Sequence, residues 1–134
     1  MILDKTSAAI YTTLQSGTAL AALLPGTTSI YDTQAPDGAT LPYVVFSHQG
    51  GGPENVDANA LEQNIWYVRA YGTVSPKNST EIFAQADALL NRVNISISGF
   101  NTIWCARETN IKLVENTPSG KIWNAGALYR IRTA

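Results

Sequence analysis

The sequence predicts an α+β fold: a single mostly antiparallel sheet of four to five strands, with two main helices packed on one face. Residues 63–71 are rich in aromatic and β-branched side chains, which favour a central strand. Residues 78–93 repeat apolar side chains at helical spacing, which favours an amphipathic helix lying on that strand. The expected order is helix, three strands, helix and two strands, with hairpin-like links. No internal repeat divides the chain, so we expect a single domain over residues 1–134.

The sequence of the N-terminal part predicts one main helix, a short helical turn and two strands. Residues 4–16 favour the first helix, because apolar and small side chains recur on one of its faces. A short helical turn is expected at residues 18–24 and a short strand at residues 29–31. Residues 43–47 form a continuous apolar run, consistent with a strand covered on both faces. The face of the first helix carries Leu3, Ser7, Ile10 and Leu14.

The second helix has an expected start and a defined apolar stripe. Asn78 stands where an N-cap is expected, and Glu81 follows three residues later, as in a capping box. Gly72 and Pro76 separate this helix from the strand before it. The stripe consists of Ile82, Phe83, Ala86, Leu89, Leu90 and Val93.

The C-terminal part completes the predicted sheet. Residues 102–108 favour a strand, and residues 111–114 either continue it or begin a hairpin arm with its tip at residues 116–120. Residues 122–133 close the chain as a long strand. One face of that strand carries Trp123, Ala125, Ala127, Tyr129 and Ile131, and the other carries Leu128, Arg130 and Arg132.

The two faces of the central strand are both apolar. Trp66 and Val68 fall on one face, whereas Ile65, Tyr67 and Tyr71 fall on the other. Since the helices cover only one face, we interpret the second as a subunit interface. Charged residues make up 14% of the chain, against about 25% in typical domains. Few charged residues are expected where much of the surface contacts other protein. A lightly charged monomer would have the same composition.

Two segments lack a core-facing periodicity, and we expect them to contact other proteins. Residues 48–61 read as a long polar loop whose three glycines supply flexibility. Residues 111–121 form the hairpin arm. The expected contact residues are His48, Gln49, Gly50, Gly51, Gly52, Glu54, Asn55, Asp57, Lys112, Glu115, Asn116 and Lys121.

The composition argues against several other classes of function. A net charge of −1 provides no basic field for specific nucleic-acid binding. Cys105 is the single cysteine and His48 the single histidine, so neither a zinc cluster nor a His-based relay is expected. The N-terminus does not read as a signal peptide, and no apolar run approaches the ~20 residues of a membrane span. We therefore expect no catalytic residue, no cofactor, no metal and no membrane contact.

Four stretches together resemble a known family. They are residues 41–46 (LPYVVF), 66–71 (WYVRAY), 86–90 (ADALL) and 123–133 (WNAGALYRIRT). In this order, after an N-terminal helix, the pattern is similar to the tail completion, or tail terminator, proteins of long-tailed bacteriophages. The resemblance extends over nearly the whole chain, but it supplies no residue-level site.

The resemblance implies a structural virion protein assembled in the host cytoplasm. Such proteins form a homo-oligomeric ring, usually of six copies, at the head-proximal end of the tail. The ring caps the tail tube, ends its polymerisation and meets the head–tail connector protein. Two alternatives stay open: a head-side neck adaptor or other minor tail component, and a monomeric binding module of unknown ligand.

Overall fold

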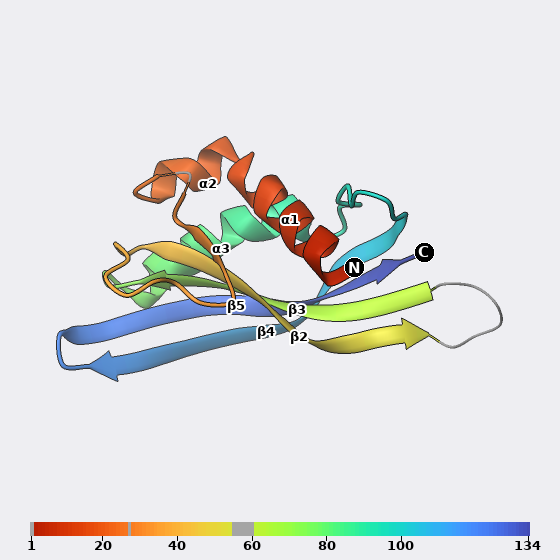
Figure 1. Ribbon diagram of the computed structural model, residues 1–134. Coiled ribbons are helices and arrows are strands. Elements are labelled where there is room, and N and C mark those ends of the chain that lie inside the picture. The colour runs from red at the N-terminus through yellow and green to blue at the C-terminus, as the bar shows by residue number, and fades with distance from the viewer. Residues whose placement is uncertain (1, 27, 55–60) are drawn as a thin grey trace.

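A five-stranded sheet forms one layer of the structure, and helices form the other (Figure 1). The computed structural model describes residues 2–26, 28–54 and 61–134. The strand order is β1-β2-β3-β5-β4; β1 and β2 are parallel, and every other neighbouring pair is antiparallel. The strands are β1 (Ile30–Asp32), β2 (Tyr43–Glu54), β3 (Leu61–Gly72), β4 (Thr102–Thr117) and β5 (Gly120–Thr133). The predicted α+β class and the central position of β3 are confirmed.

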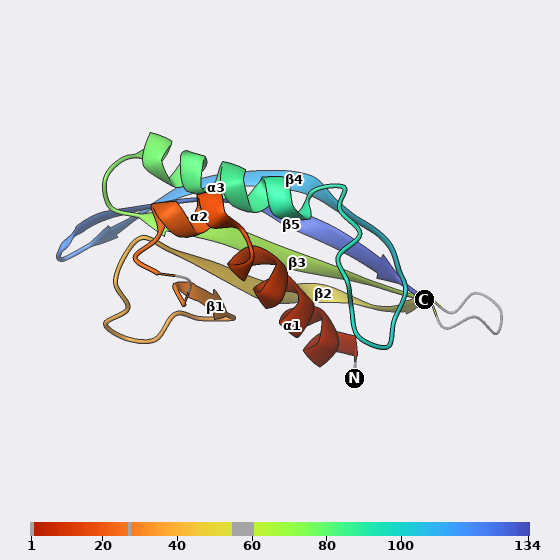
Figure 2. The ribbon, with the colours of Figure 1, turned by 90° about the horizontal axis from the view of Figure 1, so that it is seen from above.

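The helices all lie on the same face of the sheet. They are α1 (Ile2–Gln15), α2 (Thr18–Leu23) and α3 (Pro76–Leu90). Seen from above, α3 runs over the β5 side of the sheet and α1 over the β2 side, with α2 beside α3 (Figure 2). Two main helices on one face were predicted, and the short α2 was predicted at residues 18–24.

The core forms where the helical stripe meets alternate residues of the strands. On β3 the residues that face the helices are Trp66, Val68 and Ala70, all at most 2% exposed. The buried residues of α3 are Ser79, Ile82, Phe83, Ala86 and Leu90. Leu89 is partly buried against this core, and Val93 lies beyond the helix end and is 37% exposed. The stripe predicted from the sequence is therefore confirmed for the helix itself and wrong for Val93.

The prediction that Asn78 caps α3 is wrong. Ser75 is the N-cap: its backbone is extended, and its Oγ accepts a hydrogen bond of 3.1 Å from the Asn78 backbone N–H. Pro76 explains the shift, because proline is favoured in the first helical turn, where its missing N–H would have no partner. Asn78 therefore lies inside the first turn, and Glu81 pairs with Lys77 at 3.9 Å instead of closing a capping box.

Residues 48–54 do not form the predicted loop. They continue β2, which pairs with β3 from Tyr43 opposite Tyr71 to Glu54 opposite Leu61, with one bulge after His48. A Cβ at Gly51 would lie 2.3 Å from the Gln63 carbonyl oxygen, and its φ is +113°. Glycine is needed there for close strand pairing, so the prediction that these glycines supply loop flexibility is wrong. Asn55 and Asp57 lie outside the described residues.

The hairpin arm at residues 111–121 is part of two long strands. β4 runs without interruption through residues 111–114, and the β4–β5 turn lies at residues 117–120, where Thr117 Oγ1 donates to the Gly120 carbonyl at 2.7 Å. The arm projects beyond the helical layer at one end of the sheet, whereas β2 ends and β3 begins at the other end (Figure 1). Continuation of the strand, one of the two predicted alternatives, is confirmed.

Replacing leucines of the α3 stripe by alanine should destabilise the protein more at a buried position than at a partly buried one. Leu90 is 1% exposed, so Leu90→Ala should lower the free energy of unfolding by about 2–5 kcal/mol through lost burial and a cavity. Leu89→Ala, at a partly buried position of the same helix, is the matched control and should cost less. Urea denaturation followed by circular dichroism measures both; equal losses would contradict the assigned helix face.

The cap assignment predicts a second difference. Ser75→Ala should lower the free energy of unfolding by about 1 kcal/mol, because it removes the acceptor for the Asn78 N–H. Asn78→Ala retains that backbone donor and should cost less. Thermal denaturation of the two variants tests this ranking. A larger loss of stability for Asn78→Ala would show that Asn78 is the N-cap.

Candidate assembly interface

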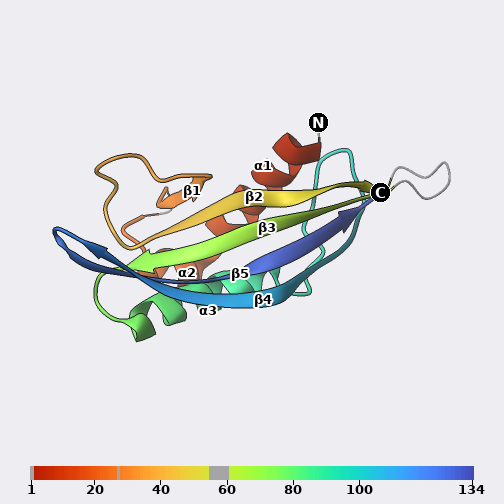
Figure 3. The same cartoon turned by 90° about the horizontal axis from the view of Figure 1, so that it is seen from below.

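The face of the sheet opposite the helices is a candidate interface. Seen from below, β2, β3, β5 and β4 lie side by side in front of the helices (Figure 3). Strand alternation places Ile65, Tyr67 and Arg69 on this face, where all three are half-buried. We call it the open face. The predicted division of β3 into two faces, each with large apolar groups, is confirmed.

Aromatic rings gather around one arginine on the open face. Ring centroids lie 5.7 Å apart for Tyr31 and Tyr43, and 5.3 Å apart for Tyr43 and Tyr71. The Arg69 guanidinium carbon lies 4.6 Å from the ring centroid of Tyr67 and 5.4 Å from that of Tyr71. We call these five residues the tyrosine–arginine cluster. Tyrosine and arginine are the side chains that most often dominate binding energy at interfaces.

The position of Arg69 depends on a glycine in the neighbouring strand. Gly126 pairs with Arg69 across β3 and β5. A Cβ at Gly126 would lie 2.9 Å from the Arg69 Cα and 3.0 Å from its Cγ. The absence of a side chain at Gly126 therefore leaves room for the arginine to lie over the tyrosine rings.

The cluster contains polar atoms without internal partners. Among the described residues, Tyr67 Oη and Arg69 Nε are buried and form no hydrogen bond. Burial raises the pKa of Tyr67 and of Tyr71, and the Arg69 charge only partly offsets this, so both hydroxyls remain neutral at physiological pH. An unsatisfied buried polar group costs about 1–3 kcal/mol, so the packing of this cluster within one copy leaves part of its hydrogen-bonding capacity unused.

The other half of the open face carries a charged network that crosses four strands. Arg130 Nε donates to Glu108 Oε1 at 2.6 Å, and Arg130 Nη1 donates to Gln63 Oε1 at 2.7 Å. Arg132 Nη2 donates to Glu54 Oε2 at 2.7 Å. The hydrogen bond from Arg130 lowers the pKa of Glu108, so this pair stays ionised at neutral pH. The open face thus combines an aromatic half with a half of fixed charges, a pattern that favours specific contacts.

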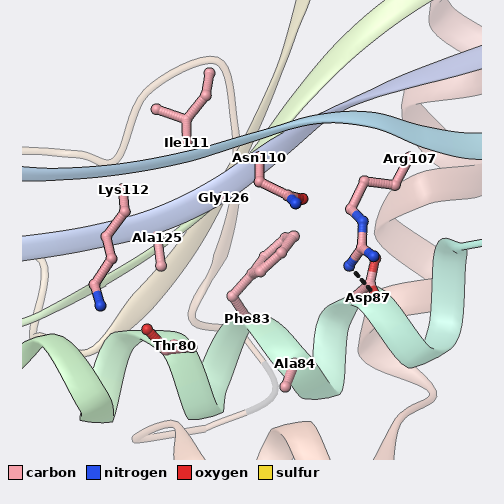
Figure 4. Close-up of a pocket in the computed structure, with 10 residues that line it drawn as sticks. All are labelled: Thr80, Phe83, Ala84, Asp87, Arg107, Asn110, Ile111, Lys112, Ala125 and Gly126. Atoms are coloured by element: carbon pink, nitrogen blue, oxygen red, sulfur yellow. Dashed lines mark hydrogen bonds and ion pairs between the residues drawn. The ribbon is translucent and has the colours of Figure 1, made fainter.

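A groove of about 360 Å³ separates α3 from the edge strand β4 (Figure 4). Arg107 and Lys112 point from β4 toward α3, whereas Ile111 points away from the helix. Arg107 Nη1 lies 2.9 Å from Asp87 Oδ2, and the buried Tyr129 hydroxyl donates to the same carboxylate. Burial and this hydrogen bond raise the pKa of Tyr129 well above its ordinary value. Asp87, which showed no role in the sequence, therefore joins α3 to β4 and β5.

The comparisons with known proteins agree with this architecture. The sequence model of the family described as "Tail completion protein gp17" matches residues 8–125, which is 118 of the 134 residues. The chain belongs to the tail completion protein gp17 family. It is a structural tail protein.

Solved structures share this fold, and one of them illustrates the match. It is a chain in the structure titled "Virion of native gene transfer agent (GTA) particle", with a TM-score of 0.82 and 15% sequence identity. The match covers 98% of this tail completion chain and 96% of that chain. No curated protein sequence matches.

The structure separates the predicted contact residues into groups. His48 faces the helices, where its Nε2 lies 2.9 Å from Asn64 Oδ1 and its ring packs against Trp66. Gln49 is exposed at the bulge of β2, and Glu54 belongs to the charged network of the open face. Gly50, Gly51 and Gly52 are strand residues of β2. Lys112, Glu115, Asn116 and Lys121 are exposed on the arm at the opposite end of the sheet.

The tyrosine–arginine cluster was only partly visible in the sequence. Tyr67 and Tyr71 were predicted on the second face, but Arg69 and Tyr31 were not assigned there. The alternation of Tyr67, Arg69 and Tyr71 along one strand is the signal that places Arg69 between the rings. Tyr31 and Tyr43 come from other strands, and only the sheet order brings them alongside.

Within the described ranges the structure shows neither a cluster of metal-ligating side chains nor a membrane-spanning helix. No group of three or more His, Cys, Asp or Glu side chains is placed to hold a metal ion in residues 2–26, 28–54 and 61–134. No described helix is long and apolar enough to cross a bilayer. Cys105 is 1% exposed, and burial raises the pKa of its thiol to about 12, so it remains a protonated core residue.

The tyrosine–arginine cluster predicts a variant that folds but assembles poorly. Arg69→Ala removes the cation from the tyrosine rings and should weaken co-sedimentation with tail tubes by roughly 30-fold, as expected for a hot spot of about 2 kcal/mol. Lys77→Ala, at an exposed position on α3, is the control and should bind normally. If Arg69→Ala retains its thermal stability and co-sediments as well as the unsubstituted protein, the cluster is not part of the interface.

Proposed function

We propose that this tail completion protein forms a ring of six copies at the head-proximal end of the phage tail. The ring caps the tail tube, ends its polymerisation and offers a second surface to the head–tail connector protein. The observation that carries this proposal is the open face, which combines the tyrosine–arginine cluster with exposed Trp104 and Leu113 and has no covering layer among the described residues. Large exposed apolar surfaces with polar surroundings favour protein–protein contact.

The two ends of the sheet support a ring in particular. The arm projects at one end and the described ends of β2 and β3 lie at the other, so the two ends are built from different strands (Figure 1). Contacts between unlike surfaces repeat head to tail, and they generate a closed ring when the rotation between neighbours closes. A two-fold pair would instead use the same surface on both partners.

The proposal includes a location and a set of partners. The protein acts as one domain over residues 1–134, assembles in the host cytoplasm and stays in the virion, where its partners are further copies of itself, the tail tube protein and the connector. It needs neither a cofactor nor an enzymatic reaction. The family match and the shared fold with a chain of a gene transfer agent virion support this assignment.

The proposal is tested by mixing the purified protein with its own tail tube protein during polymerisation. Electron microscopy should show tubes of limited length with a ring at one end, because a bound ring removes the surface on which the next tube ring assembles. Tubes polymerised without the protein are the control. Unlimited, uncapped tubes would overturn the proposal. Binding to the isolated connector alone would indicate a neck adaptor, and a single-subunit mass with no binding would indicate a monomeric module.

A further inference from the structure

We propose that the tip of the arm of one copy binds in a cleft beneath α1 of the neighbouring copy. This inference rests on the proposed ring and names its contact surfaces. The cleft lies between α1 and strands β1, β2 and β3 and has a volume of about 550 Å³. The lining residues that matter here are Asp4, Ala8, Asp32, Thr33 and Trp66.

The cleft carries a fixed negative charge. One oxygen of the Asp32 carboxylate accepts a hydrogen bond from Ser7 Oγ, and the other accepts from Thr33 Oγ1 at 2.8 Å. These hydroxyl groups orient the carboxylate without neutralising it. Asp4, exposed in the first turn of α1, adds a second carboxylate to the same lining. A basic side chain is therefore the complementary guest.

The wall of the cleft also contains a hydrogen-bond donor without an acceptor. Trp66 is 2% exposed and lines the cleft, and its indole Nε1 is buried without a partner among the described residues. An indole N–H can only donate. A guest with an oxygen that reaches this N–H, such as a backbone carbonyl or a hydroxyl group, would give it an acceptor, in addition to supplying a positive charge.

The arm offers both groups on an exposed tip. Lys121 is exposed beside the turn of Pro118 and Ser119, which presents carbonyl and hydroxyl oxygens. Leu113 and Val114, farther along the arm, are 55% and 43% exposed and have apolar surface that a partner would cover. A second copy of this chain thus supplies the charge and the acceptors that the cleft lacks.

The geometry directs this contact to another copy. The arm leaves the sheet at one end and points away from the first turns of α1 (Figure 2). Each copy therefore offers an arm to one neighbour and a cleft to the other. Repeated around a ring, this exchange uses every arm and every cleft.

Disulfide cross-linking tests the contact directly. The variant with Ala8→Cys in the cleft and Ser119→Cys at the arm tip, oxidised in the presence of tail tubes, should give a ladder of covalent oligomers on a non-reducing gel. Each single variant alone should give no ladder, and a mixture of the two should stop at dimers. The unsubstituted protein is the control for Cys105, which is buried.

Charge reversal tests the proposed pairing. Lys121→Glu in the cross-linking background should lower the yield roughly tenfold, because it places like charges together. Lys77→Glu makes the same charge change on exposed α3 and should leave the yield unchanged. Adding Asp4→Lys to Lys121→Glu should restore part of the yield.

Electron microscopy of the same samples separates the two proposals. If the tubes are capped but the double variant gives no ladder, or gives dimers alone, the arm–cleft contact is overturned and the proposed ring is retained. A ladder without capped tubes would support the contact and overturn the capping function. The absence of both would overturn both.

Discussion

A sheet has two faces, and this chain has helices for only one of them. Trp66, Val68 and Ala70 form the core under α1 and α3, so the alternate residues of β3 face the other way. The chain partly shields them by laying Arg69 over two tyrosine rings and by pairing Arg130 with Glu108. No helix of the described chain covers these residues. The open face and its unpaired polar atoms are the physical reason to expect assembly.

Close strand pairing extends the sheet beyond its helical layer. Gly51 lets β2 approach β3 where a Cβ would meet the Gln63 carbonyl, and Gly126 makes room for Arg69. The two ends of the sheet are built from different strands, with the β4–β5 arm at one end and the ends of β2 and β3 at the other (Figure 1). The proposed assembly contacts therefore use extended strands instead of a compact binding loop.

The sequence predictions were most successful where the signal was periodic. The stripe of α3 and the two faces of β3 follow from helical and strand spacing, which are local properties. Predictions failed where a distant residue decided the outcome. Gly50 to Gly52 read as a flexible loop, yet cross-strand partners 63 to 65 hold them in β2. Asn78 had suitable chemistry for a cap, but Pro76 placed the helix start one turn earlier.

Hydrophobic periodicity, which is a local property, was enough to predict the α+β class, the central strand, the amphipathic helix and the surplus of apolar residues on a second face. Which side chains meet on that face follows instead from long-range folding. Tyr31, Tyr43 and Tyr71 belong to three strands, and Asp87 reaches Arg107 and Tyr129 across two elements. Their proximity depends on strand order and register, which arise from pairing between segments far apart along the chain.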